Sequence, residues 1–401
     1  MTPKPKSLLT KLDVPTKYLF SAGITNMSTR VKAAMILPLL SQSDPQFQQI
    51  LKDITEGIRY IFQTSNRHSF AISGPNCLAF ETAISNLTET DDKILLMEHG
   101  ADGERMAKSS KTLTRKLIRL QVANPGDLVD TEPIKQALTA HQPKVLFLRH
   151  GDTSAGTLQP LRGIGALCRK NNCIFMVDAS ATVCCAPLSM DKLEIDVLIA
   201  GTQFALGLSP GLTLMSFNDR AVKAISQRKC RISHTMNFDL LAQSWGLTGD
   251  EKVVYHYTPS ISLLYALRES LAEVVDEGLD KMIERHMKFS LVAQKEISKI
   301  GLKFLVEEES KRLTSVLVIQ VPDSIKRDAI IEYLYKYYNV IISSGIPPID
   351  KVWRIGILGQ NANRSPVKLL ITVLRESIQL AKKSEGESSL RSPSTISSTI
   401  E

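Results

Sequence analysis

The chain has 401 residues, of which 43% are apolar and 22% charged, and its formal net charge is +8. These values are close to the average for a soluble globular protein, and the length exceeds what one hydrophobic core supports, so we expect one large and one smaller domain. No apolar run approaches the ~20 residues that cross a bilayer, and the basic residues form no stripe with interleaved aromatic residues. We therefore expect neither a membrane nor a nucleic acid as a partner.

Residues 1–30, with three prolines, are expected to form an irregular N-terminal arm. Residues 31–262 are expected to form the large domain, because short apolar runs alternate there with helical patterns. Strands are predicted at 69–73, 93–98, 116–122, 145–149, 173–177, 197–200 and 213–217, and helices at 77–87, after 100, and near 133–140. This alternation predicts an α/β domain, a parallel sheet with helices on both faces.

Residues 263–381 are expected to form a linking helical segment and a small α+β domain. The segment 263–300 has one apolar face, and strands are predicted at 315–320, 339–343 and 352–357 with a helix at 326–338. The tail 382–401 is rich in serine and lacks apolar periodicity, so we expect it to be disordered.

Neither the six cysteines nor the seven histidines are spaced like the ligands of a metal site. Cys184 and Cys185 are expected to pack as small apolar groups after a strand. His286 is expected to be exposed on an amphipathic helix, and His150 and Ser154 are close in sequence without further evidence for a catalytic triad. Residues 1–12 hold lysines but no apolar block, so we expect no secretory signal and reduced thiols.

Polar residues follow three of the predicted strands where they end, at 151–156, 178–180 and 201–204. In open parallel sheets, ligands bind at the carboxyl ends of the strands. Asp178 stands directly after an apolar run. A carboxylate in that place must be solvated, cap the helix that follows, or pair with a cation.

Several dense stretches in this order resemble the class V aminotransferases, and within them the alanine–glyoxylate/serine–pyruvate aminotransferases. They are the runs at 56–64 (EGIRYIFQT), 150–156 (HGDTSAG), 196–203 (DVLIAGTQ), 255–258 (YHYT), 267–271 (LRESL) and 354–359 (RIGILG). The resemblance extends from about residue 19 to 380. It implies the fold of the pyridoxal-phosphate-dependent aminotransferases (fold type I), with a mostly parallel seven-stranded sheet in the large domain.

Members of that family hold pyridoxal 5'-phosphate as a Schiff base with a lysine, while an aspartate pairs with the pyridinium nitrogen. Asp178 matches the aspartate, but Phe204 stands where the lysine is due. The lysine anchors the cofactor and moves the proton between carbon atoms, and phenylalanine has no nitrogen or titratable group for either task. We therefore expect no covalent attachment of the cofactor.

Three further regions depart from the family pattern. In the turn that cups the cofactor phosphate, Pro75 removes a backbone donor and Asn76 replaces a usual glycine. Asp102 stands where an aromatic ring normally stacks on the pyridine. The N-terminal turn that lines the substrate pocket is reduced to residues 21–24, with Gly23 as its glycine.

Other positions retain the family pattern. The resemblance implies that Thr153 places a hydroxyl near the ring and that Gln203 stands beside the lost lysine. Tyr255 and Thr258 match residues that reach the phosphate from the partner subunit of a dimer. Arg354 matches the arginine that binds the substrate carboxylate through its bidentate fork; the alternative for Arg354 is a surface or inter-strand ion pair.

The sequence thus predicts an alanine–glyoxylate aminotransferase-like protein without transaminase activity. Two alternatives stay open: an active transaminase of alanine or serine with glyoxylate or pyruvate, and a non-catalytic dimeric interaction or regulatory protein. The expected partners are a second copy of the chain or an active paralogue, and the expected ligand is a small amino or keto acid. Family members are often peroxisomal or mitochondrial, but residues 398–401 do not match the peroxisomal tripeptide, so the cytoplasm is the default expectation.

Overall fold

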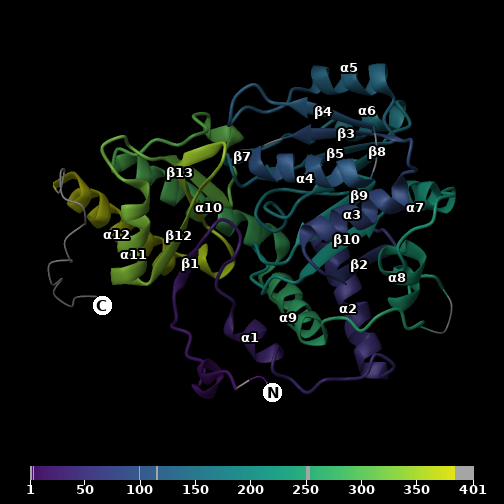
Figure 1. Ribbon diagram of the computed structural model, residues 1–401, viewed down its shortest axis with the longest axis horizontal. Coiled ribbons are helices and arrows are strands. Elements are labelled where there is room, and N and C mark those ends of the chain that lie inside the picture. Colours follow the sequence, from purple (N-terminus) through teal and green to yellow (C-terminus); the bar gives the residue numbers. More distant parts are fainter. Residues whose placement is uncertain (1, 3, 99, 114–115, 250–252, 384–401) are drawn as a thin grey trace.

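The computed structural model describes residues 2, 4–98, 100–113, 116–249 and 253–383. Two hydrophobic cores divide these residues into a large domain and a smaller one, which lie side by side in Figure 1. The tail predicted to be disordered lies outside the described residues from 384 onward. Among the described residues, every helix is too short or too polar to cross a lipid bilayer.

A seven-stranded sheet forms the centre of the large domain, with the strand order β2-β10-β9-β8-β5-β3-β4. Its strands are β2 (His68–Ser73), β3 (Lys93–Glu98), β4 (Lys116–Gln121), β5 (Val145–Arg149), β8 (Ile174–Asp178), β9 (Val197–Gly201) and β10 (Leu212–Phe217). Only β10 runs antiparallel to its neighbours. The prediction of a mostly parallel seven-stranded sheet is confirmed.

Every residue of β5, β8 and β9 is buried, because helices cover both faces of the sheet (Figure 1). These helices and their neighbours are α1 (Thr29–Ala34), α2 (Pro45–Phe62), α3 (Asn76–Leu87), α4 (Gly100–Leu113), α5 (Thr131–His141), α6 (Ile164–Lys170), α7 (Asp219–Ser226) and α8 (Phe238–Ser244). Helix α2 shows how the sequence starts such a helix: the Asp44 side chain accepts from the Gln46 N–H, and Pro45 occupies the first turn. Short 3-10 helices lie at Lys6–Leu9, His234–Met236, Glu309–Lys311 and Gly359–Asn361.

The helical segment predicted at 263–300 consists of two helices, α9 (Ile261–Glu277) and α10 (Leu279–Lys299). They are separated by Gly278, whose φ of +88° is a conformation that favours glycine. His286 on α10 is fully buried, so the prediction that it is exposed was wrong. The pattern of α10 shows one apolar face, but it does not show that the small domain covers His286.

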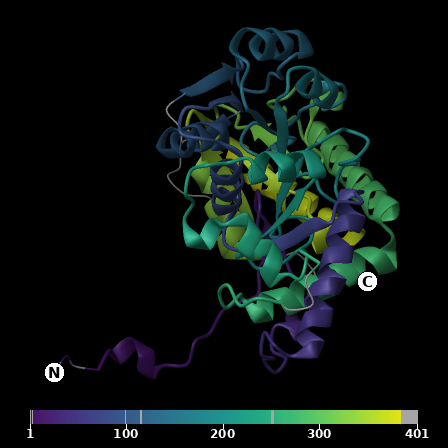
Figure 2. The ribbon, with the colours of Figure 1, turned by 90° about the vertical axis from the view of Figure 1, so that its right-hand side faces the viewer.

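The small domain contains a four-stranded sheet with the order β1-β12-β13-β11. Its elements are β1 (Tyr18–Phe20), β11 (Val316–Gln320), β12 (Val340–Ile346), β13 (Ile349–Gly356), α11 (Arg327–Tyr338) and α12 (Arg364–Lys383). Strand β1 pairs in parallel with β12, so the segment predicted as an irregular arm contributes one strand to this sheet. Residues 4–17, before β1, extend away from the body of the molecule (Figure 2).

Candidate functional site

The carboxyl ends of β5, β8 and β9 meet at one edge of the large sheet. Arg149 ends β5 and Asp178 ends β8, and the two residues are direct partners in the register. Phe204 follows β9 in a tight turn. After β5 the chain forms a small hairpin of β6 (Gly151–Asp152) and β7 (Thr157–Leu158), which carries Thr153 between its strands. The parallel topology therefore gathers most of the predicted site residues in one buried cluster.

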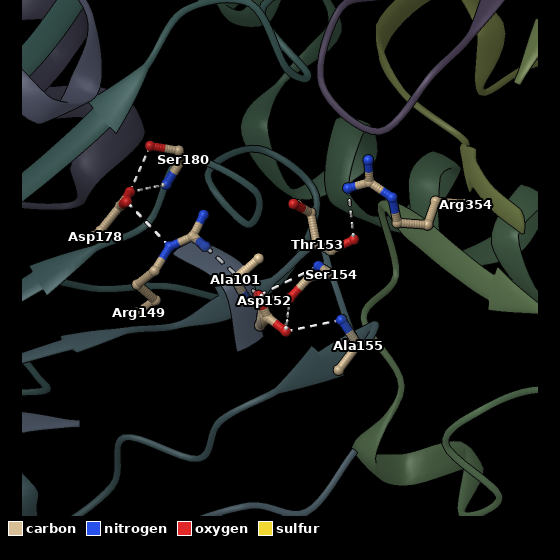
Figure 3. Close-up of polar contacts among 9 residues, drawn as sticks. All are labelled: Ala101, Arg149, Asp152, Thr153, Ser154, Ala155, Asp178, Ser180 and Arg354. Carbon is tan, nitrogen blue, oxygen red and sulfur yellow. Dashed lines mark hydrogen bonds and ion pairs between the residues drawn. The ribbon is translucent and has the colours of Figure 1, made fainter. Parts of the chain in front are cut away.

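Both carboxylate oxygens of Asp178 are engaged within the chain. Oδ1 accepts hydrogen bonds from the backbone N–H and the hydroxyl of Ser180, the former at 2.8 Å. Oδ2 accepts from Nε of Arg149 at 3.3 Å (Figure 3). Of the three environments considered for Asp178, the structure therefore shows cation pairing, together with a turn that the carboxylate caps.

Arg149 is a residue of this cluster that the sequence interpretation missed. Its side chain is buried beside the carboxylates of Asp178 and Asp152, with Nε at 3.3 Å from Asp178 and Nη1 at 3.6 Å from Oδ1 of Asp152. The signal in the sequence is an arginine that ends a strand of otherwise apolar residues. Because buried charges are usually paired, that position could have been connected with the nearby aspartates.

Asp152 organises the loop next to Arg149. Its carboxylate accepts from the hydroxyl of Ser154 at 2.8 and 2.9 Å and from the backbone N–H of Ala155 at 2.8 Å. The Ser154 hydroxyl in turn accepts from the N–H of Ala101, in the first turn of α4, at 3.2 Å. Figure 3 shows these groups as one connected set. They are structural bonds of a buried loop, and Ser154 pairs with an aspartate rather than with His150.

His150 is buried and lies next to Thr182, with 2.9 Å between Nδ1 and the hydroxyl oxygen. Burial lowers the pKa of His150 to about 4. The ring is therefore neutral near pH 7 and carries no charge toward the site.

Phe204 is 6% exposed and packs into the large core. Its carbonyl accepts from the N–H of Gly207 at 2.9 Å, which closes the turn after β9. The structure places Gly23 beside this ring, since a Cβ added to Gly23 would lie 3.7 Å from Cε1 of Phe204. The ring therefore fills the space between the strand-end turn and the N-terminal turn.

No lysine side chain is buried anywhere in the described ranges. Lys192 and Lys223, the lysines nearest to Phe204 in sequence, are both exposed. A nucleophilic amine for imine formation is thus missing from this cluster, at least among the residues that the structure describes.

The turn expected to cup a phosphate begins α3, with Pro75 as its N-cap residue. The side chain of Asn76 donates to the hydroxyl of Ser180, and its carbonyl oxygen accepts from Thr213 at 3.3 Å. A Cβ added to Gly201 would collide with the side-chain oxygens of Asn76 and Gln203, so the half-buried Gln203 also lies here. Asn76 therefore uses its polar atoms within the protein. The Asp102 side chain lies outside the described part of the chain.

Arg354 on β13 connects the small domain to the cluster. Its Nε donates to the Ser344 carbonyl at 2.8 Å, and its Nη1 donates to the Thr153 carbonyl at 3.3 Å (Figure 3). Burial lowers its pKa and the negative charge of Asp152 partly opposes this, but a guanidinium stays charged near pH 7. No described carboxylate lies within 4.0 Å of it, so the surface or inter-strand ion pair considered for Arg354 is not formed.

Tyr255 and Thr258 lie on the surface, outside the buried cluster. Tyr255 is 70% exposed, and its hydroxyl is 3.1 Å from that of Thr258. Both line a cavity of about 820 Å³ whose wall includes Leu40, Phe47 and Trp245. Within the described residues, no group of three or more histidine, cysteine, aspartate or glutamate side chains is arranged to hold a metal ion.

Known proteins resemble this chain along nearly its whole length. The family model for aminotransferase class-V matches residues 18–370. The chain is 37% identical over 383 residues to the alanine–glyoxylate aminotransferase of Oryctolagus cuniculus, which covers 95% of this chain and 97% of that protein. It is also 37% identical over 384 residues to that of Drosophila melanogaster, with the same coverage. The crystal structure of alanine–glyoxylate aminotransferase from Nostoc sp. superimposes with a TM-score of 0.90 at 29% identity, covering 94% of this chain and 100% of that one. The resemblance seen in the sequence motifs is confirmed, and the chain belongs to the class-V aminotransferase family.

Proposed function

We propose that this alanine–glyoxylate aminotransferase-like protein has no transaminase activity and acts as a non-catalytic subunit of a dimer. The observation that carries the proposal is Phe204, which occupies the buried turn after β9 where the Schiff-base lysine is due. An apolar ring cannot form an imine, and it cannot transfer a proton at the substrate carbon.

The residues at this site do not fit a covalently held pyridoxal phosphate. Phe204 leaves no amine, and the described lysines are all outside the buried cluster. Asp178, which would pair with the pyridinium nitrogen, already pairs with Arg149 at 3.3 Å. We therefore assign no chemical step to the cofactor in this chain.

The role as a dimer subunit is supported by the surface rather than by the buried cluster. Tyr255 and Thr258 match residues that the family uses across its dimer interface, and here they are exposed next to Val253 and Val254. A subunit that has lost its own chemistry while keeping these hydroxyls could still supply them to a partner. The partner would be a second copy of this chain or an active paralogue.

Absorbance spectroscopy and borohydride trapping test the absence of transaminase chemistry. The purified chain is mixed with pyridoxal phosphate, reduced with borohydride and digested for mass spectrometry. We expect no imine absorbance, no pyridoxyl-lysine peptide, and turnover of alanine plus glyoxylate at the background rate. A purified active alanine–glyoxylate aminotransferase, treated identically, is the positive control. A labelled lysine in this chain, or turnover above background with pyridoxamine phosphate supplied, would overturn the proposal.

Light scattering tests the dimer separately. We expect a dimer at micromolar concentration, and co-purification of a tagged and an untagged chain that are expressed together. A monomer at that concentration would contradict the assignment of the chain as a dimer subunit, whatever the result of the imine experiment.

A further inference from the structure

We infer that Arg149 replaces the cofactor as the charge partner of Asp178, so that the site is closed by an internal polar network as well as by Phe204. The inference rests on the proposed function and adds to Phe204 a second barrier against binding of pyridoxal phosphate. Its consequence is that a lysine restored at position 204 does not by itself restore imine formation with pyridoxal phosphate.

The network begins at the turn that would cup a phosphate. Asn76 donates to the hydroxyl of Ser180, and Ser180 donates to Asp178 while also accepting from the N–H of Gly201 at 2.9 Å. The amide of Asn76 is thus bonded to a residue that holds the strand-end aspartate. The two subsites that the family uses for phosphate and pyridinium are here connected directly by protein side chains.

The network continues through Arg149 to the other side of the cluster. Arg149 pairs with Asp178 and with Asp152, and Asp152 accepts from Ser154. The Ser154 hydroxyl accepts from the N–H of Ala101 in α4, as Figure 3 shows. The side chains of Arg149, Asp152, Ser154 and Asp178 are each no more than about one-twentieth exposed. A continuous set of bonds therefore joins the first turn of α3 to the first turn of α4.

Charge explains why this network excludes a pyridinium ring. Two buried carboxylates, Asp152 and Asp178, require a positive partner, and Arg149 supplies one permanently because its guanidinium does not deprotonate in proteins. A protonated pyridine nitrogen would be a second cation at the same acceptor. To admit it, Asp178 would have to release Arg149, which would take one anionic partner away from a buried guanidinium.

Three variants separate the roles of Phe204 and Arg149: Phe204→Lys, Phe204→Lys/Arg149→Ala, and the matched control Phe204→Lys/Arg220→Ala. Arg220 also pairs with a buried aspartate, Asp196, at 2.6 Å, but from α7 and away from the cluster. Each purified variant is titrated with pyridoxal phosphate. Imine absorbance, borohydride trapping and the shift in melting temperature on adding pyridoxal phosphate are recorded.

We expect no imine and no melting shift for Phe204→Lys or for the Arg220 control. For Phe204→Lys/Arg149→Ala we expect a trapped imine on Lys at position 204 and binding of pyridoxal phosphate at least tenfold tighter than in the single variant. If the alanine variant does not fold, Phe204→Lys/Arg149→Gln takes its place, since glutamine keeps a polar side chain without the charge.

Imine formation by Phe204→Lys alone would overturn the inference and leave the proposed function intact, because the natural chain lacks that lysine. A folded double variant that forms no imine would also overturn it, since Arg149 would then not be the barrier. An imine in the unaltered chain would instead overturn the proposed function.

Discussion

The ring of Phe204 lies beside Gly23, with 3.7 Å between ring atom Cε1 and the place where a Cβ of Gly23 would stand. Two turns that are about 180 residues apart in sequence thus close on each other at the site. The space between them is occupied by an aromatic side chain that belongs to the large core.

Replacement of Phe204 by alanine should destabilise the fold, because the ring is 6% exposed and its removal leaves a cavity. We expect Phe204→Ala to lower the free energy of unfolding by about 3–5 kcal/mol and Phe204→Leu by about 1 kcal/mol, measured by urea unfolding. Leu291→Ala on the exposed face of α10 is the control and should change it by less than about 0.5 kcal/mol. An unaltered stability of Phe204→Ala would show that the ring does not fill the site.

Arg354 should stabilise the contact between the two domains through its bond to Thr153 of the large domain, while its bond to Ser344 lies within the small sheet. We expect Arg354→Ala to lower the free energy of unfolding by about 2–3 kcal/mol, because hydrogen bonds from a charged, buried donor are lost. Arg327→Ala is the control, since Arg327 pairs with the exposed Asp328 and should cost no more than about 1 kcal/mol. Equal costs for the two variants, by urea unfolding, would contradict a structural role for the buried arginine.

The sequence was sufficient for the centre of the large sheet because β5, β8 and β9 are buried along their whole length and appear as mostly apolar runs. The predicted strands at 145–149 and 197–200 agree with β5 and β9 to within one residue. The gathering of Asp178 and Phe204 at one edge followed from parallel topology alone. Both inferences depend on local patterns, which one sequence contains in full.

Contacts between elements that are distant in sequence could not be predicted from such local patterns. Arg149 faces Asp178 only because β5 and β8 are neighbours in register, and β1 joins the small sheet through pairing with residues more than 300 positions away. The helical pattern around His286 identified an apolar face but placed this polar residue outside it. Its burial depends on two bonds, to Met282 and Gly359, the second of which is far along the chain.

The stability of the protein should fall as the pH is lowered from about 6.5 to about 4, partly because of His286. Burial, with Arg285 nearby, lowers the pKa of this imidazole to about 4, and in the neutral ring Nδ1 donates to Met282 while Nε2 accepts from the Gly359 N–H at 3.0 Å. The unfolded chain binds a proton on His286 near pH 6.5 and the folded chain does not, so acid favours unfolding. Between these two pKa values, His286 lowers the free energy of unfolding by about 1.4 kcal/mol for each pH unit of acidification.

His286→Asn should reduce that slope by about the amount of one titrating group, measured by chemical unfolding between pH 4 and 7.5. Above pH 7 the natural chain and the variant should show the same pH dependence, although the variant is less stable because the bond to Gly359 is altered. His150, whose pKa burial also lowers to about 4, should account for a further part of the slope. An unchanged slope in His286→Asn would mean that the imidazole is protonated in the folded protein.

Val254→Asp should weaken the proposed dimer, because Val253, Val254 and Tyr255 form an exposed, mostly apolar stretch beside the retained Thr258. A carboxylate buried against a partner without a counter-charge costs several kcal/mol, about 3 or more, which raises the dissociation constant by roughly 100-fold or more, measurable by analytical ultracentrifugation. Leu291→Asp, a similar change at an exposed position of α10, should leave the dimer intact. If Leu291→Asp dissociates the dimer and Val254→Asp does not, the interface lies on another face, and Tyr255 and Thr258 are not positioned to reach a partner subunit.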